Sequence, residues 1–393
     1  MRKGGFRIGT LVVLFSLWLF PVSVGSAAAQ QKARARALGV PFEGTPGPLN
    51  AITDVAGVEV GHTTLIAGDG PLKVGVGPVR TGVTAILPRG KQGDAAVFAG
   101  WFSLNGNGEM TGTTWIDESG MLDGPVMITN THSVGVVRDA VIAWKIREGH
   151  VGMDGYWWSL PVVAETWDGF LNDINGFHVK PADAAHALDT AHDGRVEEGN
   201  VGGGTGMVCN EFKGGIGTSS RRLEGKDGGY TVGVLVQCNY GRRDQLRIAG
   251  VPVGVEIPEH AAYANDTGSI IVVVATDAPL LPSQLKRLAR RAGPGVARMG
   301  SYSGNGSGDL FVAFSTANRD AMKDEPLQSA QFVGNDHLDP LFLGTVEATE
   351  EAIVNAMVAA KDMQGDGGRY AKAISHPDLV ALLKKFNRYQ PQK

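Results

Sequence analysis

The apolar residues of this chain form short runs, and clusters of glycine separate these runs from one another. Short runs rich in Val and Ile, bounded by turn-forming residues, are typical of β-strands. We predict strands at residues 74–79, 82–87, 230–238, 270–275 and 309–315. The run at 270–275 is apolar at every position, which predicts a strand that is buried on both faces.

A second pattern, in which apolar residues recur about every three or four positions, predicts helices. The expected helices cover residues 136–148, 182–191 and 283–292, the last capped by Ser283. Another begins at Thr345 or Thr349 and holds Ile353, Met357 and Ala360, and the final one is capped by Ser375 and holds Leu379, Leu382, Leu383 and Phe386. Strands and helices interleave, and no Pro- or Ser-rich linker follows residue 50, so we predict a single α/β domain.

The first 29 residues have the three parts of a secretory signal. Basic residues at positions 2, 3 and 7 precede an apolar run over 11–20, and alanines at 27–29 end the segment. The run is short and ends at Pro21, which favours a cleaved signal over a membrane anchor. We therefore expect residues 1–29 to be removed and the mature protein to be periplasmic or secreted, with no membrane partner.

Charge and cysteine content narrow the possible partners and cross-links. The net charge of −4 and the lack of a long basic stretch argue against nucleic acid as a partner. The basic cluster at 286–291 is interleaved with Leu288 and Ala289, which fits the solvated face of a helix. Cys209 and Cys238 allow at most one internal disulfide, and we predict two buried thiols instead.

The common catalytic motifs are missing from the sequence. It contains no Gly-x-Ser-x-Gly elbow, no His-Glu-x-x-His and no Walker loop. The glycine clusters at 105–108 and 202–206 lack the spacing of a dinucleotide loop, so we interpret both as turns. His186 and His192 make no convincing ligand pair. We predict neither a metal site nor a cofactor.

The segment 265–274 suggests a different chemistry. A polar loop ends at Gly268, and Ser269 then opens the apolar run. If the Ser269 hydroxyl attacks the Gly268 carbonyl, an acyl shift followed by hydrolysis frees Ser269 as a new N-terminus. Its α-amine, with a reference pKa of about 8, can then act as the general base for its own hydroxyl. The dipeptide alone is equally typical of an ordinary turn before a strand.

The segment from Gly268 to Pro282 resembles the self-processing site of the DmpA-type aminopeptidases, which include L-aminopeptidase/D-esterases and β-peptidyl aminopeptidases. The resemblance continues at residues 50–55, 160–169, 202–207, 236–241 and 306–309, and so spans nearly all of the mature chain. It implies a four-layer α/β/β/α sandwich of the N-terminal-nucleophile-hydrolase type. It also implies cleavage into chains 30–268 and 269–393 that stay together, a homo-oligomer, often a tetramer, and release of N-terminal residues from small peptides, amides or esters without a metal.

Site roles follow from the resemblance, position by position. Ser269 is the implied nucleophile and base, Asn239 the donor to the oxyanion, and Ser307 with Asp309 the pair that orients the Ser269 amine. Relatives can have glutamate where this chain has Asp309. Glu165 is the candidate that binds the substrate amine, and Trp167, where some relatives carry tyrosine, is expected to wall the pocket.

Two other functions remain compatible with the sequence. A self-processing acyltransferase of the ornithine acetyltransferase type usually has threonine as its nucleophile and works inside the cell, unlike a chain with Ser269 and a signal. An exported binding protein without enzymatic activity would stay uncleaved, so the mass of the mature chain separates it from the aminopeptidase.

Overall fold

The computed structural model describes residues 1, 4–5, 33–93, 95–150, 154–258, 268–319 and 325–391. The expected signal segment lies outside the described residues except for Met1, Gly4 and Gly5, so it stays a prediction. Ala33–Lys393 forms one unit. Within the described ranges, no helix is both long and apolar enough to cross a membrane.

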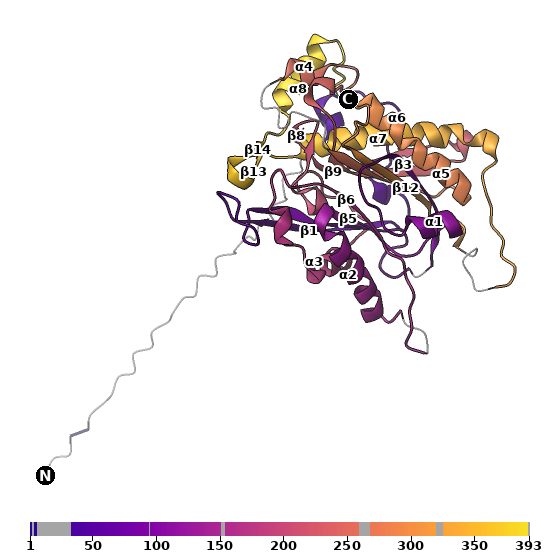
Figure 1. The fold of residues 1–393 in the computed structure, drawn as a ribbon, viewed down its shortest axis with the longest axis horizontal. Coiled ribbons are helices and arrows are strands. Elements are labelled where there is room, and N and C mark those ends of the chain that lie inside the picture. The colour runs from indigo at the N-terminus through magenta and orange to yellow at the C-terminus, as the bar shows by residue number, and fades with distance from the viewer. Residues whose placement is uncertain are drawn as a thin grey trace. The chain divides into compact units, whose positions relative to one another are not determined.

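Two β-sheets form the middle of this unit (Figure 1). The six-stranded sheet has the order β4, β3, β12, β11, β10, β9, and the four-stranded sheet the order β1, β2, β5, β6. The first sheet consists of β3 (Val97–Gly106), β4 (Met121–Leu122), β9 (Gly215–Arg222), β10 (Thr231–Asn239), β11 (Ser269–Thr276) and β12 (Gly308–Ser315). The second consists of β1 (Glu59–Ala67), β2 (Val79–Leu87), β5 (Val126–Asn130) and β6 (Val162–Thr166).

Helices cover the outer face of each sheet. The four-stranded sheet is covered by α2 (Val134–Arg147) and α3 (Pro181–Asp189), and the six-stranded sheet by α5 (Pro282–Arg290), α6 (Ala292–Arg298) and α7 (Asp339–Ala359) (Figure 1). The layers are therefore α/β/β/α, as predicted. The smaller elements are α1 (Thr113–Ser119), α4 (Val253–Glu256), α8 (His376–Lys385), the pair β7 (Val208–Cys209) and β8 (Phe212–Lys213), and the pair β13 (Met363–Gln364) and β14 (Tyr370–Ala371).

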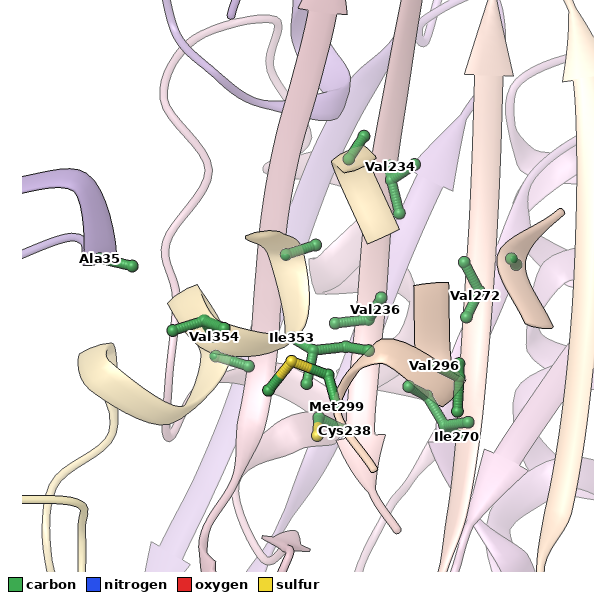
Figure 2. Packing of buried hydrophobic residues seen from close by; sticks show 14 of the residues in the cluster. Ala35, Val234, Val236, Cys238, Ile270, Val272, Val296, Met299, Ile353 and Val354 are labelled. Carbon is green, nitrogen blue, oxygen red and sulfur yellow. The ribbon is translucent and has the colours of Figure 1, made fainter. Parts of the chain in front are cut away.

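The apolar side chains of β11 contribute to two separate hydrophobic cores, one on each face of the six-stranded sheet. Ile270 and Val272 pack toward the helices, against Val296 and other buried residues (Figure 2). Ile271 and Val273, on the opposite face, pack against the four-stranded sheet. Because successive side chains of a strand point to opposite faces, a strand between two apolar layers must be apolar throughout. The prediction that this run is buried on both faces is confirmed, and a third core lies between the four-stranded sheet and α2 and α3.

Three of the predicted element positions are wrong. Residues 74–77 form a turn, and the strand begins only at Val79, because Gly75 and Gly77 have φ of 82° and 130°, which breaks the extended conformation. The helix α5 begins after Leu281 rather than at a Ser283 cap. The helix α7 begins at Asp339, ahead of Thr345 and Thr349, whose hydroxyls donate to carbonyls of the preceding turn. The Ser375 cap of α8 is confirmed, since its side chain accepts from the Asp378 N–H.

Cys209 and Cys238 form a disulfide, so the prediction of two buried thiols is wrong. Cys209 lies on β7 and Cys238 near the end of β10, and the fold brings their Cα atoms to 5.5 Å, a separation that suits a disulfide. Residues 29 positions apart in sequence gave no sign of this proximity. The bond ties β7 to β10 at the residue before Asn239.

Candidate active site

Ser269 is the first residue of β11, which lies between β10 and β12 in the six-stranded sheet. In the antiparallel pairing with β10, Ser269 lies opposite Asn239, and in the parallel pairing with β12, Ile270 lies opposite Asp309. Ser269 is 5% exposed. Backbone pairing therefore gathers three of the predicted site residues at one end of three adjacent strands.

The start of β12 contacts the Ser269 side chain directly. The backbone N–H of Gly308 donates to Ser269 Oγ at 3.1 Å. On either side of this glycine, the Ser307 hydroxyl donates to Asp309 Oδ1 at 2.5 Å, and both side chains are buried. Ser307 and Asp309 therefore lie on the same side, as their spacing of two predicted. Their hydrogen bond makes one unit of a hydroxyl and a carboxyl beside Ser269.

Asn239 has its side-chain amide fixed at both atoms. Its Oδ1 accepts from the Val208 N–H at 2.7 Å, and its Nδ2 donates to the Trp167 carbonyl at 2.9 Å. An amide held in this way cannot flip, so a second N–H of Nδ2 points in a fixed direction. Gly268 passes closely over the same residue, because a methyl group on Gly268 would lie 2.0 Å from the Asn239 carbonyl oxygen. Only glycine fits immediately before Ser269.

Glu165 lies on β6, at the edge of the four-stranded sheet, and is 4% exposed. Its Oε2 accepts from the Thr131 hydroxyl at 2.5 Å and its Oε1 from the Glu109 N–H at 2.9 Å. Burial raises the pKa of the Glu165 carboxyl, and these two hydrogen bonds partly offset that rise. A buried carboxyl with a raised pKa gains most from a cation, so the site suits an ammonium group.

Trp167 lies just beyond the end of β6, so strand alternation does not determine where its side chain points. Its indole covers Gly169, where a methyl group would lie 2.6 Å from Nε1. The contact that joins Trp167 to the other site residues is its carbonyl, which holds Asn239. The wall expected from the indole remains a prediction.

The two sheets approach each other at Gly108. A methyl group on Gly108 would lie 3.2 Å from Glu165 Oε1 and 3.3 Å from the Gly308 Cα. The carboxylate of Glu165 is therefore separated from Gly308 by less than the sum of these two distances. Since the Gly308 N–H contacts Ser269, the structure brings Glu165 and Ser269 into one site.

Sequence reasoning missed several groups at this site. The Gly308 N–H lies within the motif 306–309, but a backbone donor leaves no mark on residue type. The hydroxyl of Thr131 had no sequence signal. Asp168 was quoted only as part of a motif, yet it is fully buried, with Asn130 and Asn172 donating to its two oxygens at 3.0 and 3.1 Å. Burial raises the pKa of the Asp168 carboxyl to about 6.

No group of three or more metal-ligating side chains lies together in the described parts of the chain. His186 is on α3, and its Nδ1 lies 3.1 Å from the Thr63 hydroxyl. The reactive groups at this site are thus a serine hydroxyl, amide and backbone donors, and carboxylates. This set suits acyl transfer through a serine ester.

Comparison with known proteins agrees with this chemistry. The model of peptidase family S58 matches residues 50–371. "Beta-peptidyl aminopeptidase BapA" of Sphingosinicella microcystinivorans is 55% identical over 386 residues, covering 94% of this chain and 96% of the relative. The protein of the same name from Sphingosinicella xenopeptidilytica is 48% identical and covers 92% of this chain and 94% of its own length.

Solved structures show the same fold. The L-aminopeptidase D-Ala-esterase/amidase of Ochrobactrum anthropi, described as a prototype of the serine aminopeptidases and a variant of the Ntn hydrolase fold, superposes with a TM-score of 0.86 at 49% identity. The match covers 91% of this chain and 99% of that one. A β-aminopeptidase of a Burkholderia species gives a TM-score of 0.82, also at 49% identity, over 90% of this chain and 99% of its own. The prediction of an N-terminal-nucleophile-hydrolase fold is confirmed.

Proposed function

The chain belongs to peptidase family S58 and is an aminopeptidase, and we propose that it removes β-amino acids from the N-termini of short peptides with Ser269 as its nucleophile. The observation that carries the proposal is the position of Ser269 at the start of a central strand, with the Gly308 N–H at its Oγ. The preference for β-amino acids is supported by the two relatives named as β-peptidyl aminopeptidases. The comparisons do not favour the acyltransferase or the binding protein.

Maturation precedes activity in this proposal. The Ser269 hydroxyl attacks the Gly268 carbonyl carbon, the bond from that carbon to the Ser269 nitrogen breaks, and the nitrogen leaves as a free amine. Water then hydrolyses the resulting ester. The products are a chain 30–268 ending in the Gly268 carboxylate and a chain 269–393 beginning with the Ser269 amine. Because Gly268 lies against the Asn239 backbone, the scissile bond is held beside the groups that later bind the substrate.

In the mature enzyme, the Ser269 amine takes the hydroxyl proton as Oγ attacks the substrate carbonyl. The Asn239 Nδ2 and the Gly308 N–H donate to the oxyanion that forms. Ser307 and Asp309 orient the Ser269 amine through their joined hydroxyl and carboxyl. The proton then passes to the leaving amine, and water releases the amino acid from the serine ester.

Glu165 binds the ammonium group of the substrate, and Trp167 lines the same end of the pocket. Hydrogen bonds from Thr131 and Glu109 occupy one direction at each carboxylate oxygen and leave others for the ligand. An ammonium bound here fixes the N-terminal residue, so the enzyme cuts after the first residue only. The substrates are therefore small peptides, amides or esters with a free amine.

Export and assembly form a second part of the proposal. The disulfide of Cys209 and Cys238 is typical of oxidising compartments and supports removal of residues 1–29 during export to the periplasm or medium. The resemblance to tetrameric aminopeptidases supports a homotetramer. Fractionation of cells expressing the full chain, and light scattering of the purified protein, test these two statements.

The deciding experiment is intact mass measurement and N-terminal sequencing of the purified, denatured protein. We expect two chains, the smaller beginning Ser-Ile-Ile-Val, together with release of the first residue from a β-dipeptide amide. A single uncleaved chain would leave Ser269 without a free amine and would contradict the mechanism.

A further inference from the structure

A short segment joins the two halves of the proposed site, and it comes from the glycine cluster whose sequence predicted a turn. Residues 105–109, named here the strap, comprise the last two residues of β3 and the three residues that follow it. Their first end holds the loop that carries Ser307. Asn105 Nδ2 donates to the Gly304 carbonyl at 2.6 Å, and Asn107 Nδ2 donates to the Gly306 carbonyl at 2.9 Å.

The other end of the strap holds Glu165. The Glu109 N–H donates to Glu165 Oε1, and Gly108 lies between that oxygen and the Gly308 Cα. Gly308 also lies directly against the strap, since a methyl group on Gly308 would lie 2.4 Å from the Asn107 carbonyl oxygen. The strap thus lies between the amine-binding carboxylate and the donor to Ser269, with no room for a side chain at Gly308 and little at Gly108.

A β-bulge sets the path of the strap. Asp309 of β12 pairs with Asn105, but the next residue, Leu310, pairs with Ser103, so Leu104 is the extra residue of β3. A bulge bends its strand and redirects the residues beyond it. The bulge lies between Asp309 and Leu310; beyond it β3 still pairs with β12 as far as Gly106, and its continuation reaches Glu165 of the other sheet.

We propose that the strap selects the substrate by setting the separation between the Glu165 carboxylate and Ser269. The inference rests on the proposed function of these two residues. An α-amino acid has one carbon atom between its amine and the scissile carbonyl, and a β-amino acid has two, so the required separations differ by about one bond length, roughly 1.5 Å. A misplacement of about 1 Å at the reacting atoms costs about 10²-fold in rate, so a strap of fixed length discriminates between the two classes.

The test compares two strap variants on paired substrates, the α- and β-alanine amides of one chromogenic amine. Asn107→Ala removes the hydrogen bond to Gly306, and Asn107 is exposed, so this variant folds. Gly108→Ala puts a methyl group 3.2 Å from Glu165 Oε1 at a residue whose φ is ordinary. We expect each to lower the β-to-α ratio of kcat/KM by at least about fivefold, while self-cleavage remains complete.

Matched controls separate this effect from loss of stability. Asn200→Ala removes another amide that joins two loops, through Lys361, and Gly225→Ala adds a methyl group in open space. Both should keep the wild-type ratio. The inference is overturned if the wild-type enzyme shows no preference, or if both strap variants lose activity on the two substrates by the same factor. Should Gly108→Ala fail to fold, Asn107→Ala decides alone.

Failure of the proposed function would look different. A wild-type enzyme that stays uncleaved, or is inactive on both amides, overturns the function of Ser269 and the inference with it. A cleaved, active wild-type enzyme, with Ser269→Ala inactive, leaves the function intact whatever the strap variants do.

Discussion

The two sheets hold their parts of the site in different ways. In the six-stranded sheet, Ser269, Asn239 and Asp309 are placed by backbone pairing of three adjacent strands. In the four-stranded sheet, the backbone of Glu165 pairs with β5 on one side only, because β6 is an edge strand, and its carboxylate is held by a threonine hydroxyl and by a backbone N–H of the strap. Backbone pairing is shared by every residue of a strand, whereas the contacts of Glu165 depend on a few groups in loops.

This difference suggests that the six-stranded sheet determines the rate of the chemical step, whereas the contacts of Glu165 determine which substrate is preferred. A substitution near Ser269 has to disturb a ladder of hydrogen bonds before it can move the backbone, so the nucleophile keeps its place and single groups can be removed cleanly. The position of the Glu165 carboxylate relative to Ser269 can change when one loop contact changes. We therefore expect substitutions on the six-stranded side to act on kcat and those on the four-stranded side to act on KM and substrate preference.

The largest expected effect comes from Ser269→Ala. It removes the attacking oxygen for both self-cleavage and turnover, so the chain stays whole on a denaturing gel and kcat falls by at least about 10⁴-fold. Ser269→Cys should cleave slowly, because the thiol is also a nucleophile. Ser283→Ala, at a serine that turned out not to cap α5, serves as the control and should process normally. Normal processing of Ser269→Ala would exclude this serine as the nucleophile.

Asn239→Ala tests the six-stranded sheet, and we expect it to lower kcat less than Ser269→Ala does. It removes one donor to the oxyanion, and kcat should fall about 10²- to 10³-fold with little change in KM. Steady-state kinetics on a chromogenic amide provide the measurement. If KM rises instead and kcat is retained, Asn239 binds substrate, and the division between the two sheets is wrong at this residue.

Glu165→Gln tests the four-stranded sheet, which holds the group proposed to bind the substrate amine. Loss of the carboxylate should lower kcat/KM by about 10- to 100-fold, mainly through KM, because the charged ammonium loses its partner. In the wild-type enzyme, the raised pKa of Glu165 means that the carboxylate protonates at a higher pH than an ordinary glutamate. KM should therefore rise on acidification from a pH where an ordinary glutamate is still ionised, and the variant should lose this rise. Glu118→Gln, at an exposed carboxylate, should keep it.

Asp168→Asn has the smallest expected effect, on stability alone. The pKa of the Asp168 carboxyl is about 6 in the folded protein, against 3.8 for a free side chain, so the folded state binds more protons between these values. Wild-type stability must then fall as pH rises through that window, by at most about 3 kcal/mol from this group. Thermal unfolding at several pH values should show a flatter profile for the variant; an unchanged slope would mean that Asp168 titrates normally.

Sequence patterns predicted an element correctly where the local preference of its residues and their environment in the fold favour the same conformation. The apolar run at 270–275 has one stable environment, between two layers, and the structure places it there. The run at 74–79 also alternates apolar residues with small ones, but its two glycines adopt positive φ, so its first residues form a turn instead of a strand. The site residues came from resemblance to a family, since Asn239 or Ser307 alone would fit any turn.

The contacts that support the site could not be predicted, because they join residues distant in sequence. β7 lies against the end of β10, which brings Cys209 to Cys238, and the strap reaches Glu165 beyond a bulge at Leu104 of β3. Neither the backbone donor of Gly308 nor the hydroxyl of Thr131 follows from residue type. These groups need three-dimensional coordinates.

The central position of β11 also fixes an order of events in time. Ser269 has its neighbours only when β11 has paired with β10, which precedes it in the chain, and with β12, which follows it. Assembly of the sheet must therefore come before any reaction at Gly268. Afterwards β11 remains hydrogen-bonded to β10 and β12 along its length, so a cut before its first residue does not release this strand from the sheet. The intact chain is therefore the species that folds, and cleavage follows. Two chains made separately would have to associate and pair β11 with β10, whereas a single chain forms this pairing as it folds.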